Sequence, residues 1–263
     1  MAPMPIVKVN GIDLYYEEHG TGMPIVVIHG TSSSALVWGD AVHELAARGR
    51  CVVYDRRGCF RSQRPEPYER TDVAEHGADV AALIDALGAA PAIVIGRSYG
   101  GETALDLVRR RPETVSALVL LEAAVLTLDP EAMAWAQPLK DKILATAERD
   151  MSAVGETFIR AVAGDDAWDS FPSELHEMFT QNGPAIAAEF RGRWLEMSED
   201  ELRSITQPTL IVSAKDSPEA FRRVGARMAE LLPNCETVRV EGGHLVNPAH
   251  PDVLRFIDRV MKA

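Results

Sequence analysis

The sequence of 263 residues has few cysteines, no long hydrophobic run and a shortage of positive charge. Its three cysteines, Cys51, Cys59 and Cys235, are odd in number and lack the paired spacing of metal ligands, so we expect no disulfide and no metal site. No stretch reaches about 18 consecutive apolar residues, the length of a membrane-spanning helix. No basic segment followed by an apolar run, the pattern of a signal peptide, is visible at the start. We therefore expect a cytoplasmic protein without a membrane partner.

Acidic residues outnumber basic residues by 39 to 27, which gives a formal net charge of -12. A surface of this sign repels phosphate groups and argues against nucleic acid as a partner. Hydrophobic residues make up 46% of the chain, enough for a large buried core. Folds of the α/β class often run past about 200 residues as one unit, so the length alone does not fix the number of domains.

Short apolar segments separated by helical periodicity organise most of the chain. Five of these segments have the pattern of buried strands: residues 24–28, 51–54, 92–95, 117–121 and 209–212. The dipeptide Asn10-Gly11 favours a hairpin between two further strands, at 6–9 and 12–18. Uninterrupted apolar strands that alternate with amphipathic helices predict an α/β fold, with a mostly parallel sheet covered by helices on both faces.

Residues 123–205 break this pattern, because they are helical in periodicity and contain no strand-like run. We expect a helical cap over 123–205, inserted after the sixth strand, and a core formed by 1–122 and 206–263. The insertion is rich in aromatic residues, namely Trp135, Phe158, Trp168, Phe171, Phe179, Phe190 and Trp194. Any one of them could simply pack the cap against the core, but together they predict an apolar pocket between the two.

The candidate nucleophile is Ser98, within Gly96-Arg97-Ser98-Tyr99-Gly100. These residues match the pattern G-x-S-x-G, between the strand-like residues 92–95 and a helical pattern from Thr103. In that context the serine occupies a strained turn that exposes its hydroxyl, and the glycines let strand and helix approach closely. The five-residue pattern alone is weak, and its position between strand and helix distinguishes it from a chance glycine-rich turn.

A serine hydroxyl needs a general base, and we assign that role to His244. The chain holds seven histidines: His19, His29, His43, His76, His176, His244 and His250. The chain order of nucleophile, acid and base requires a histidine near the C-terminus, which leaves His244 and His250. His244 follows the strand-like residues 237–240, whereas His250 precedes Pro251 at a helix start and is expected to be a solvated terminus residue.

Attack on a carbonyl creates an oxyanion, for which two backbone N–H groups must already be in place. We expect one from Tyr99, beside the nucleophile, and one from Thr31 in the loop after residues 24–28, with Gly30 as the neighbouring alternative. His29 lies in the same loop, and we expect its imidazole to brace the loop rather than to act in catalysis.

Together these motifs resemble the α/β-hydrolase superfamily over essentially the whole chain. The matching segments are His29-Gly30, Tyr54-Asp55-Arg56-Arg57-Gly58, the serine turn, Pro208-Thr-Leu-Ile-Val212 and Gly242-Gly243-His244. In length and cap pattern the chain is most similar to zearalenone-type lactone hydrolases. The resemblance implies the α/β-hydrolase fold and hydrolysis through an acyl-enzyme, without a cofactor.

Two departures from the family pattern concern the site. Phe60 stands where the loop D-x-R-G-x-G-x-S has its second glycine, which predicts an altered loop path and an aromatic ring near the pocket entrance. Most members carry the triad acid last in G-x-x-D, a position that is Ser217 here, with Asp216 one residue early. Glu122 ends the sixth strand, where zearalenone-type lactone hydrolases carry their acid. Because a carboxylate after an apolar strand is costly unless paired, we favour Glu122 and keep Asp216 as the alternative.

The expected reaction is cleavage of a carboxylic ester or lactone of a medium-sized apolar substrate. A serine at position 98 argues against epoxide hydrolase and haloalkane dehalogenase chemistry, which needs a carboxylate nucleophile there. C–C bond hydrolysis, cofactor-free perhydrolysis and ligand binding without catalysis remain alternatives on the same fold. The expected partner is a small molecule, and the sequence leaves the oligomeric state, a homodimer included, undetermined.

Overall fold

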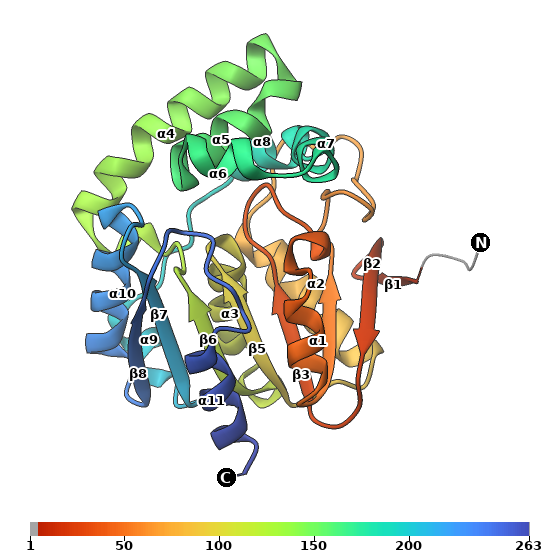
Figure 1. Cartoon of the computed structure of the whole chain (residues 1–263), viewed down its shortest axis with the longest axis vertical. Helices are drawn as coiled ribbons and strands as arrows, with labels where there is room; N and C mark the ends of the chain where they lie inside the picture. Colours follow the sequence, from red (N-terminus) through yellow and green to blue (C-terminus); the bar gives the residue numbers. More distant parts are fainter. Residues whose placement is uncertain (1–4, 263) are drawn as a thin grey trace.

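In a computed structural model, which describes residues 5–262, eight strands form one sheet in the order β1-β2-β4-β3-β5-β6-β7-β8 (Figure 1). β1 and β2 form an antiparallel hairpin, β2 pairs antiparallel with β4, and the remaining pairings are parallel. The strands are β1 (Ile6–Val9), β2 (Ile12–His19), β3 (Pro24–Ile28), β4 (Arg50–Tyr54), β5 (Ala92–Arg97), β6 (Val115–Leu121), β7 (Thr209–Ala214) and β8 (Cys235–Val240). The predicted α/β fold class is confirmed.

The apolar residues of the central strands alternate between the two faces of the sheet. In β3, Val26 and Ile28 belong to the cluster on one face, and Ile25 and Val27 belong to the cluster on the other. Successive side chains of a strand point to opposite faces, so a strand that is covered on both faces needs an uninterrupted apolar run. This requirement explains why the central strands could be read from short apolar segments.

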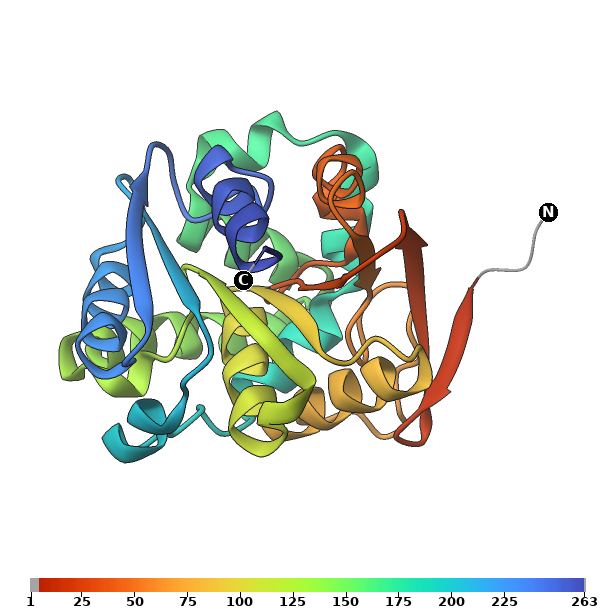
Figure 2. The same ribbon diagram turned by 90° about the horizontal axis from the view of Figure 1, so that it is seen from below.

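Helices cover both faces of the sheet, and Figure 2 shows the two layers on opposite sides of it. One face carries α2 (Val73–Ala86), α3 (Tyr99–Arg110) and α10 (Glu219–Leu231). The other face carries α1 (Ala41–Ala46) and α11 (Pro251–Val260). The described residues also form short 3-10 helices, namely η1 (Ala35–Trp38), η2 (Pro112–Thr114), η3 (Leu126–Leu128) and η4 (Met151–Ala153). No helix within residues 5–262 is long and apolar enough to cross a membrane.

A further layer of helices lies over one end of the sheet (Figure 1). It comprises α4 (Pro130–Arg149), α5 (Val154–Ala163), α6 (Asp165–Ser170), α7 (Ser173–Gln181) and α8 (Gly183–Arg191), and we call α4–α8 the cap. The cap helices have an apolar cluster of their own, which includes Ile143, Phe158 and Trp168. α9 (Glu199–Ser204) packs against α10 instead, although the range proposed for the cap, 123–205, includes it.

The loop after β4 is tied to the cap at Phe60. Phe60 has a φ of +41°, in the left-handed region that favours glycine, and its N–H donates to Asn182 Oδ1 at 2.7 Å. Asn182 Nδ2 in turn donates to Ser33 O at 2.9 Å. The Phe60 ring packs against the apolar cluster of the cap. The hydrogen bond to Asn182 fixes the altered backbone of this loop, and an aromatic ring near the pocket entrance stays a prediction.

Candidate active site

Ser98 occupies the turn between β5 and α3, with a φ of +53°. A Cβ on Gly96 would lie 2.3 Å from Gly100 O, and one on Gly100 would lie 2.2 Å from Ile28 O. Both positions therefore require glycine, as the sequence pattern indicates. α3 begins at Tyr99, earlier than the start predicted at Thr103, because this turn leads directly into the helix.

The N–H group of Tyr99 is left free by the geometry of the turn. The carbonyl of the Ser98–Tyr99 peptide accepts from Gly101 N at 2.8 Å and from Ala124 N at 3.3 Å. In a trans peptide the N–H points opposite to the C=O, so the Tyr99 N–H points away from these donors, out of the first turn of α3. The Tyr99 N–H donates to no described residue.

The N–H group of Thr31 is oriented in a similar way from the loop after β3. The carbonyl of the Gly30–Thr31 peptide accepts from the Arg56 guanidinium at 3.0 Å and from His29 Nδ1 at 2.9 Å. The Thr31 N–H points the opposite way, and no described residue accepts from it. The Thr31 hydroxyl donates to Glu189 Oε2 at 2.7 Å, which ties the same loop to α8.

His29 braces this loop. Its Nε2 accepts from Arg56 N–H at 2.8 Å, so the ring proton lies on Nδ1, which donates to Gly30 O. Burial lowers the pKa of His29 well below 6.5, and the charge of Arg56 lowers it further. The imidazole is therefore neutral at neutral pH, and both ring nitrogens are used within the loop.

His244 lies between β8 and α11, and its Nδ1 is 3.3 Å from Glu122 Oε2. Glu122 Oε1 accepts from Ala214 N–H at 2.7 Å, and Oε2 also accepts from the Ser217 hydroxyl. Ser217 thus stands where most of the family has an acid, and it supplies a hydrogen-bond donor to a carboxylate from the neighbouring strand. The Asp216 side chain is exposed and contacts none of these groups among the described residues.

The His244 imidazole is buried, with 3% of its surface exposed. Burial lowers its pKa below 6.5; the hydrogen bond to Glu122 opposes this shift, and the charge of Arg97 adds to it. The Phe221 ring of α10 lies against the imidazole, with 4.1 Å between ring centroids. Nε2 makes no hydrogen bond to a described residue, so it is free to face the cavity that His244 shares with Ser98.

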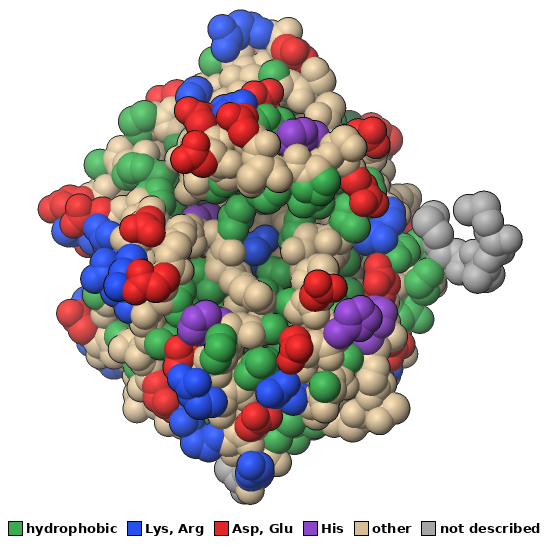
Figure 3. Space-filling model, in the orientation of Figure 1, with side chains coloured by type: hydrophobic (Ala, Val, Ile, Leu, Met, Phe, Trp, Pro, Cys, Tyr) green, Lys and Arg blue, Asp and Glu red, His purple; other side chains and the backbone are tan. Residues whose placement is uncertain are grey.

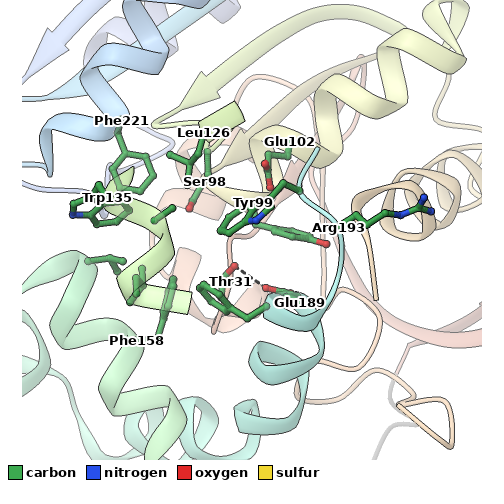
Figure 4. Close-up of a pocket in the computed structure, with 16 residues that line it drawn as sticks. Thr31, Ser98, Tyr99, Glu102, Leu126, Trp135, Phe158, Glu189, Arg193 and Phe221 are labelled. Atoms are coloured by element: carbon green, nitrogen blue, oxygen red, sulfur yellow. Dashed lines mark hydrogen bonds between the residues drawn. The ribbon is translucent and has the colours of Figure 1, made fainter. Parts of the chain in front are cut away.

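A narrow apolar cavity of about 60 Å³ lies between the cap and the core. Figure 4 shows Ser98 among its labelled residues, with Trp135, Phe158 and Phe221 on one side and Tyr99 and the Thr31–Glu189 hydrogen bond on the other. Its wall also includes Leu126, Leu139, Val162, Phe190 and Trp194. Four of the aromatic residues singled out from the sequence therefore line it: Trp135, Phe158, Phe190 and Trp194.

A second, more polar cavity of about 200 Å³ contains Ser98 and His244 together. Thr31, Phe158 and Val162 line both cavities, as Ser98 does, so the serine lies where the two meet. Two more of the predicted aromatics, Phe171 and Phe179, line this polar cavity, while Trp168 stacks on His176 inside the cap. We call these spaces the apolar cavity and the polar cavity.

Three contributors were missed from the sequence. Ser217 was identified only as a departure from the family pattern, and Phe221 was not singled out. Arg97 was treated as a variable position of the serine turn, although an arginine at the end of a fully apolar strand is a signal of its own. Within residues 5–262, no three His, Cys, Asp or Glu side chains lie close enough together to ligate a metal ion.

Comparisons with known proteins agree with this fold. A family model described as "Alpha/beta hydrolase family" matches residues 25–255. A putative carbamate hydrolase from Azorhizobium caulinodans is 29% identical, over 95% of each chain. A pimeloyl-[acyl-carrier protein] methyl ester esterase from Nitrosospira multiformis is 26% identical, over 95% of this chain and 98% of the other. The structure of a thermophilic esterase from Thermogutta terrifontis superposes with a TM-score of 0.78 at 23% identity, over 99% of this chain and 98% of that one.

Proposed function

The chain belongs to the alpha/beta hydrolase family, and we propose that it is a serine hydrolase that cleaves carboxylic esters or lactones through an acyl-enzyme. One observation carries the proposal: Ser98 and His244 line the same cavity, and the Nδ1 side of His244 is held by Glu122. A nucleophile, a base within the same cavity and a group that orients the base make up the constellation that acyl transfer needs.

The proposed mechanism assigns a role to each group. His244 Nε2 takes the Ser98 hydroxyl proton as the oxygen attacks the substrate carbonyl and forms a tetrahedral intermediate. The N–H groups of Tyr99 and Thr31 donate to the oxyanion, and Glu122 stabilises the imidazolium. The imidazolium then protonates the leaving alkoxide as the C–O bond breaks. Water, activated by the same imidazole, hydrolyses the acyl-enzyme and frees Ser98.

The lining of the two cavities supports a substrate with at least one apolar part. The apolar cavity offers Leu126, Trp135, Trp194 and Phe221, which favour an alkyl or aryl group over a sugar or a peptide backbone. The named activities of similar proteins, carbamate and methyl ester hydrolysis, are chemistry of the same acyl-transfer class. We therefore propose an esterase or lactonase.

The test is covalent labelling with a fluorophosphonate together with turnover of p-nitrophenyl esters and macrolactones. The wild-type protein should be labelled stoichiometrically at Ser98, and Ser98→Ala should lose labelling and at least about 1000-fold in kcat. Ser116→Ala, the same change on β6 away from both cavities, is the matched control and should keep both. A protein that only binds ligands would label poorly, and a C–C hydrolase would label without turning over the esters.

The acid is tested with a matched pair of amides, Glu122→Gln and Asp216→Asn. Glu122→Gln should lower kcat by about 1000- to 10,000-fold, because an amide does not stabilise the imidazolium and favours the wrong tautomer. Asp216→Asn should change kcat by less than about threefold, because its side chain is exposed. The opposite ranking would assign the role to Asp216.

A further inference from the structure

Arg97 is the last residue of β5 and directly precedes the proposed nucleophile. Only 7% of its surface is exposed, and Arg97 lines the polar cavity together with Ser98 and His244. Burial lowers its pKa to about 10, so the guanidinium remains charged at neutral pH. A buried charge is costly unless it is paired, which makes the partner of this group a question about function.

The described part of the chain supplies no such partner. Arg97 forms no ion pair and donates no side-chain hydrogen bond within residues 5–262, whereas Arg56 and Arg57, equally buried after β4, are each paired with a carboxylate. Its guanidinium carbon lies 4.5 Å from the centroid of the Trp38 ring. Stacking of this kind uses the flat face of the guanidinium and leaves the N–H groups at its edge available. Trp38 therefore orients the Arg97 guanidinium without accepting a hydrogen bond from its N–H groups.

The polar cavity has the composition of an anion site. Among the residues that line it, Arg97 is the only one with a permanent positive charge, and none is an Asp or a Glu. Ser33 contributes a buried hydroxyl that has no described hydrogen-bond partner. Figure 3 shows a small Lys or Arg surface near the centre of the face where the cap meets the core, surrounded by hydrophobic and uncharged groups.

The position of His244 indicates which part of a substrate enters this cavity. The base that takes the nucleophile's proton returns it to the leaving alkoxide, so the leaving group must lie on the imidazole side of the serine. His244 lines the polar cavity and does not line the apolar one. The leaving alcohol therefore extends into the polar cavity, and the acyl group extends into the apolar cavity.

We propose that the leaving alcohol of the substrate carries a carboxylate, which the guanidinium of Arg97 binds in the polar cavity with help from the Ser33 hydroxyl. The substrate class is then an ester of an apolar acid with a short hydroxycarboxylate, and this inference rests on the proposed hydrolase function. A carboxylate matches the single charge of Arg97 and the planar fork of its N–H groups. A phosphate dianion would leave an excess negative charge in a buried site.

The kinetic test uses butanoate esters of glycolate, hydroxypropanoate and hydroxybutanoate, each paired with the ester of the corresponding neutral hydroxyamide. In the wild-type protein, kcat/KM for the best acid should exceed that of its amide by about 10- to 100-fold, the range of a charged hydrogen bond. Arg97→Met should bring this ratio to about 1, and Arg97→Lys should leave an intermediate value, because lysine keeps the charge but loses the fork. The ratio compares two substrates of the same variant. A loss of active protein lowers both rates equally and therefore leaves the ratio unchanged.

The matched control is Arg239→Met, which removes an exposed arginine of β8 outside both cavities and makes the same change in net charge. It should leave the ratio of acid to amide unchanged. A wild-type ratio of 1 or less, or a ratio that survives Arg97→Met, would overturn the proposal. So would a preference seen only with the carboxylate on the acyl side, as in monoethyl succinate compared with ethyl succinamate.

Calorimetry with Ser98→Ala separates this inference from the proposed function. The acid esters should bind to Ser98→Ala more tightly than the amide esters, and the added change Arg97→Met should abolish the difference. If the wild-type protein hydrolysed no ester but this difference were present, the hydrolase function would fail and the carboxylate site would stand. If neutral esters were hydrolysed and no difference appeared in either assay, the carboxylate site would fail and the hydrolase function would stand.

Discussion

The pKa of His244 is set by opposing neighbours. Burial and the charge of Arg97 favour the neutral imidazole, and Glu122 favours the imidazolium. The net shift is downward from 6.5, because desolvation is the largest of these influences. A base that stays neutral down to a lower pH can accept a proton over a wider range of pH.

The pH dependence of kcat/KM should show this shift. In the proposed mechanism neutral His244 is the active form, so activity should be lost as the pH falls through its pKa, with a midpoint below 6.5. Below the midpoint the rate should fall by about tenfold per pH unit. Stopped assays with one ester substrate, run from about pH 4 to about pH 9, measure this midpoint. In Glu122→Gln the residual activity should have a lower midpoint still, because the carboxylate that raises the pKa is gone. A midpoint above 6.5 in the wild-type protein would contradict this account.

Two strained residues follow the ends of neighbouring strands. Ser98 and Glu122, with φ values of +53° and +51°, come directly after β5 and β6. Backbone conformations of this kind cost about 1–3 kcal/mol and persist only where surrounding bonds fix them. Ser98 N–H donates to Leu121 O at 3.0 Å, and Glu122 N–H donates to Val212 O at 2.9 Å. The strain therefore lies where the chain turns the side chains of the proposed nucleophile and the proposed acid away from the strand ends.

At the scale of single elements, α3 carries an unusual buried carboxyl group. Glu102 lies in its first turn, lines the apolar cavity and has a buried Oε1 without a described partner (Figure 4). Burial raises the pKa of Glu102 well above 4.5, and the nearby Glu189 raises it further. The carboxyl is therefore held in its protonated form well above the pH at which an exposed glutamate ionises.

The raised pKa of Glu102 predicts that Glu102→Gln stabilises the protein at about pH 8. Above about pH 4.3 the unfolded chain releases this proton while the folded protein keeps it, so stability is lost as the pH rises toward the folded pKa. Glutamine keeps the shape and removes this loss. Tm should increase by a few degrees near pH 8, at about 2–4 °C per kcal/mol, with no gain near pH 4. Glu113→Gln, which changes an exposed carboxylate just beyond α3, should give no such gain. An equal effect of Glu102→Gln at both pH values would refute the assignment.

At the scale of the whole molecule, a buried ion pair joins the cap to the core. Arg56, after β4, donates to Glu189 of α8 at 2.7 Å, and both side chains are almost fully buried. Glu189 also accepts from the Thr31 hydroxyl. The same guanidinium holds Gly30 O and thereby orients the Thr31 N–H. Docking of the cap and the geometry proposed for the oxyanion site thus depend on one arginine.

Glu189→Gln should therefore be far more damaging than the loss of an exposed ion pair. Removing one partner leaves Arg56 buried and unpaired, and the free energy of unfolding should fall by about 3–5 kcal/mol. The control is Glu156→Gln, which removes an exposed i,i+4 pair with Arg160 within the cap and should cost less than about 1 kcal/mol. Urea unfolding measured by tryptophan fluorescence compares the two variants. If both variants lost the same free energy of unfolding, the buried pair would not hold the cap to the core.

Much of the architecture could be predicted from the sequence. The two-faced strands, the hairpin at Asn10-Gly11 and the serine turn depend on residues close together in the chain, and the fold confirms each of them. Phe60 differs, because the residue that accepts from its N–H, Asn182, lies 122 positions further along the chain. Arg97 was read as a variable residue for the same reason, since its lack of a partner is visible only once the chain is folded.

What the sequence alone determined is the fold class and the residue types of the site, because apolar alternation and turn glycines act over a few residues. Only the tertiary structure decided which carboxylate meets His244. Glu122 and His244 are 122 positions apart, and their contact depends on how β6, β7 and β8 align their carboxyl ends. That alignment leaves Asp216 exposed and directs Ser217 to Glu122, since a shift of one residue in a turn reverses the direction of a side chain.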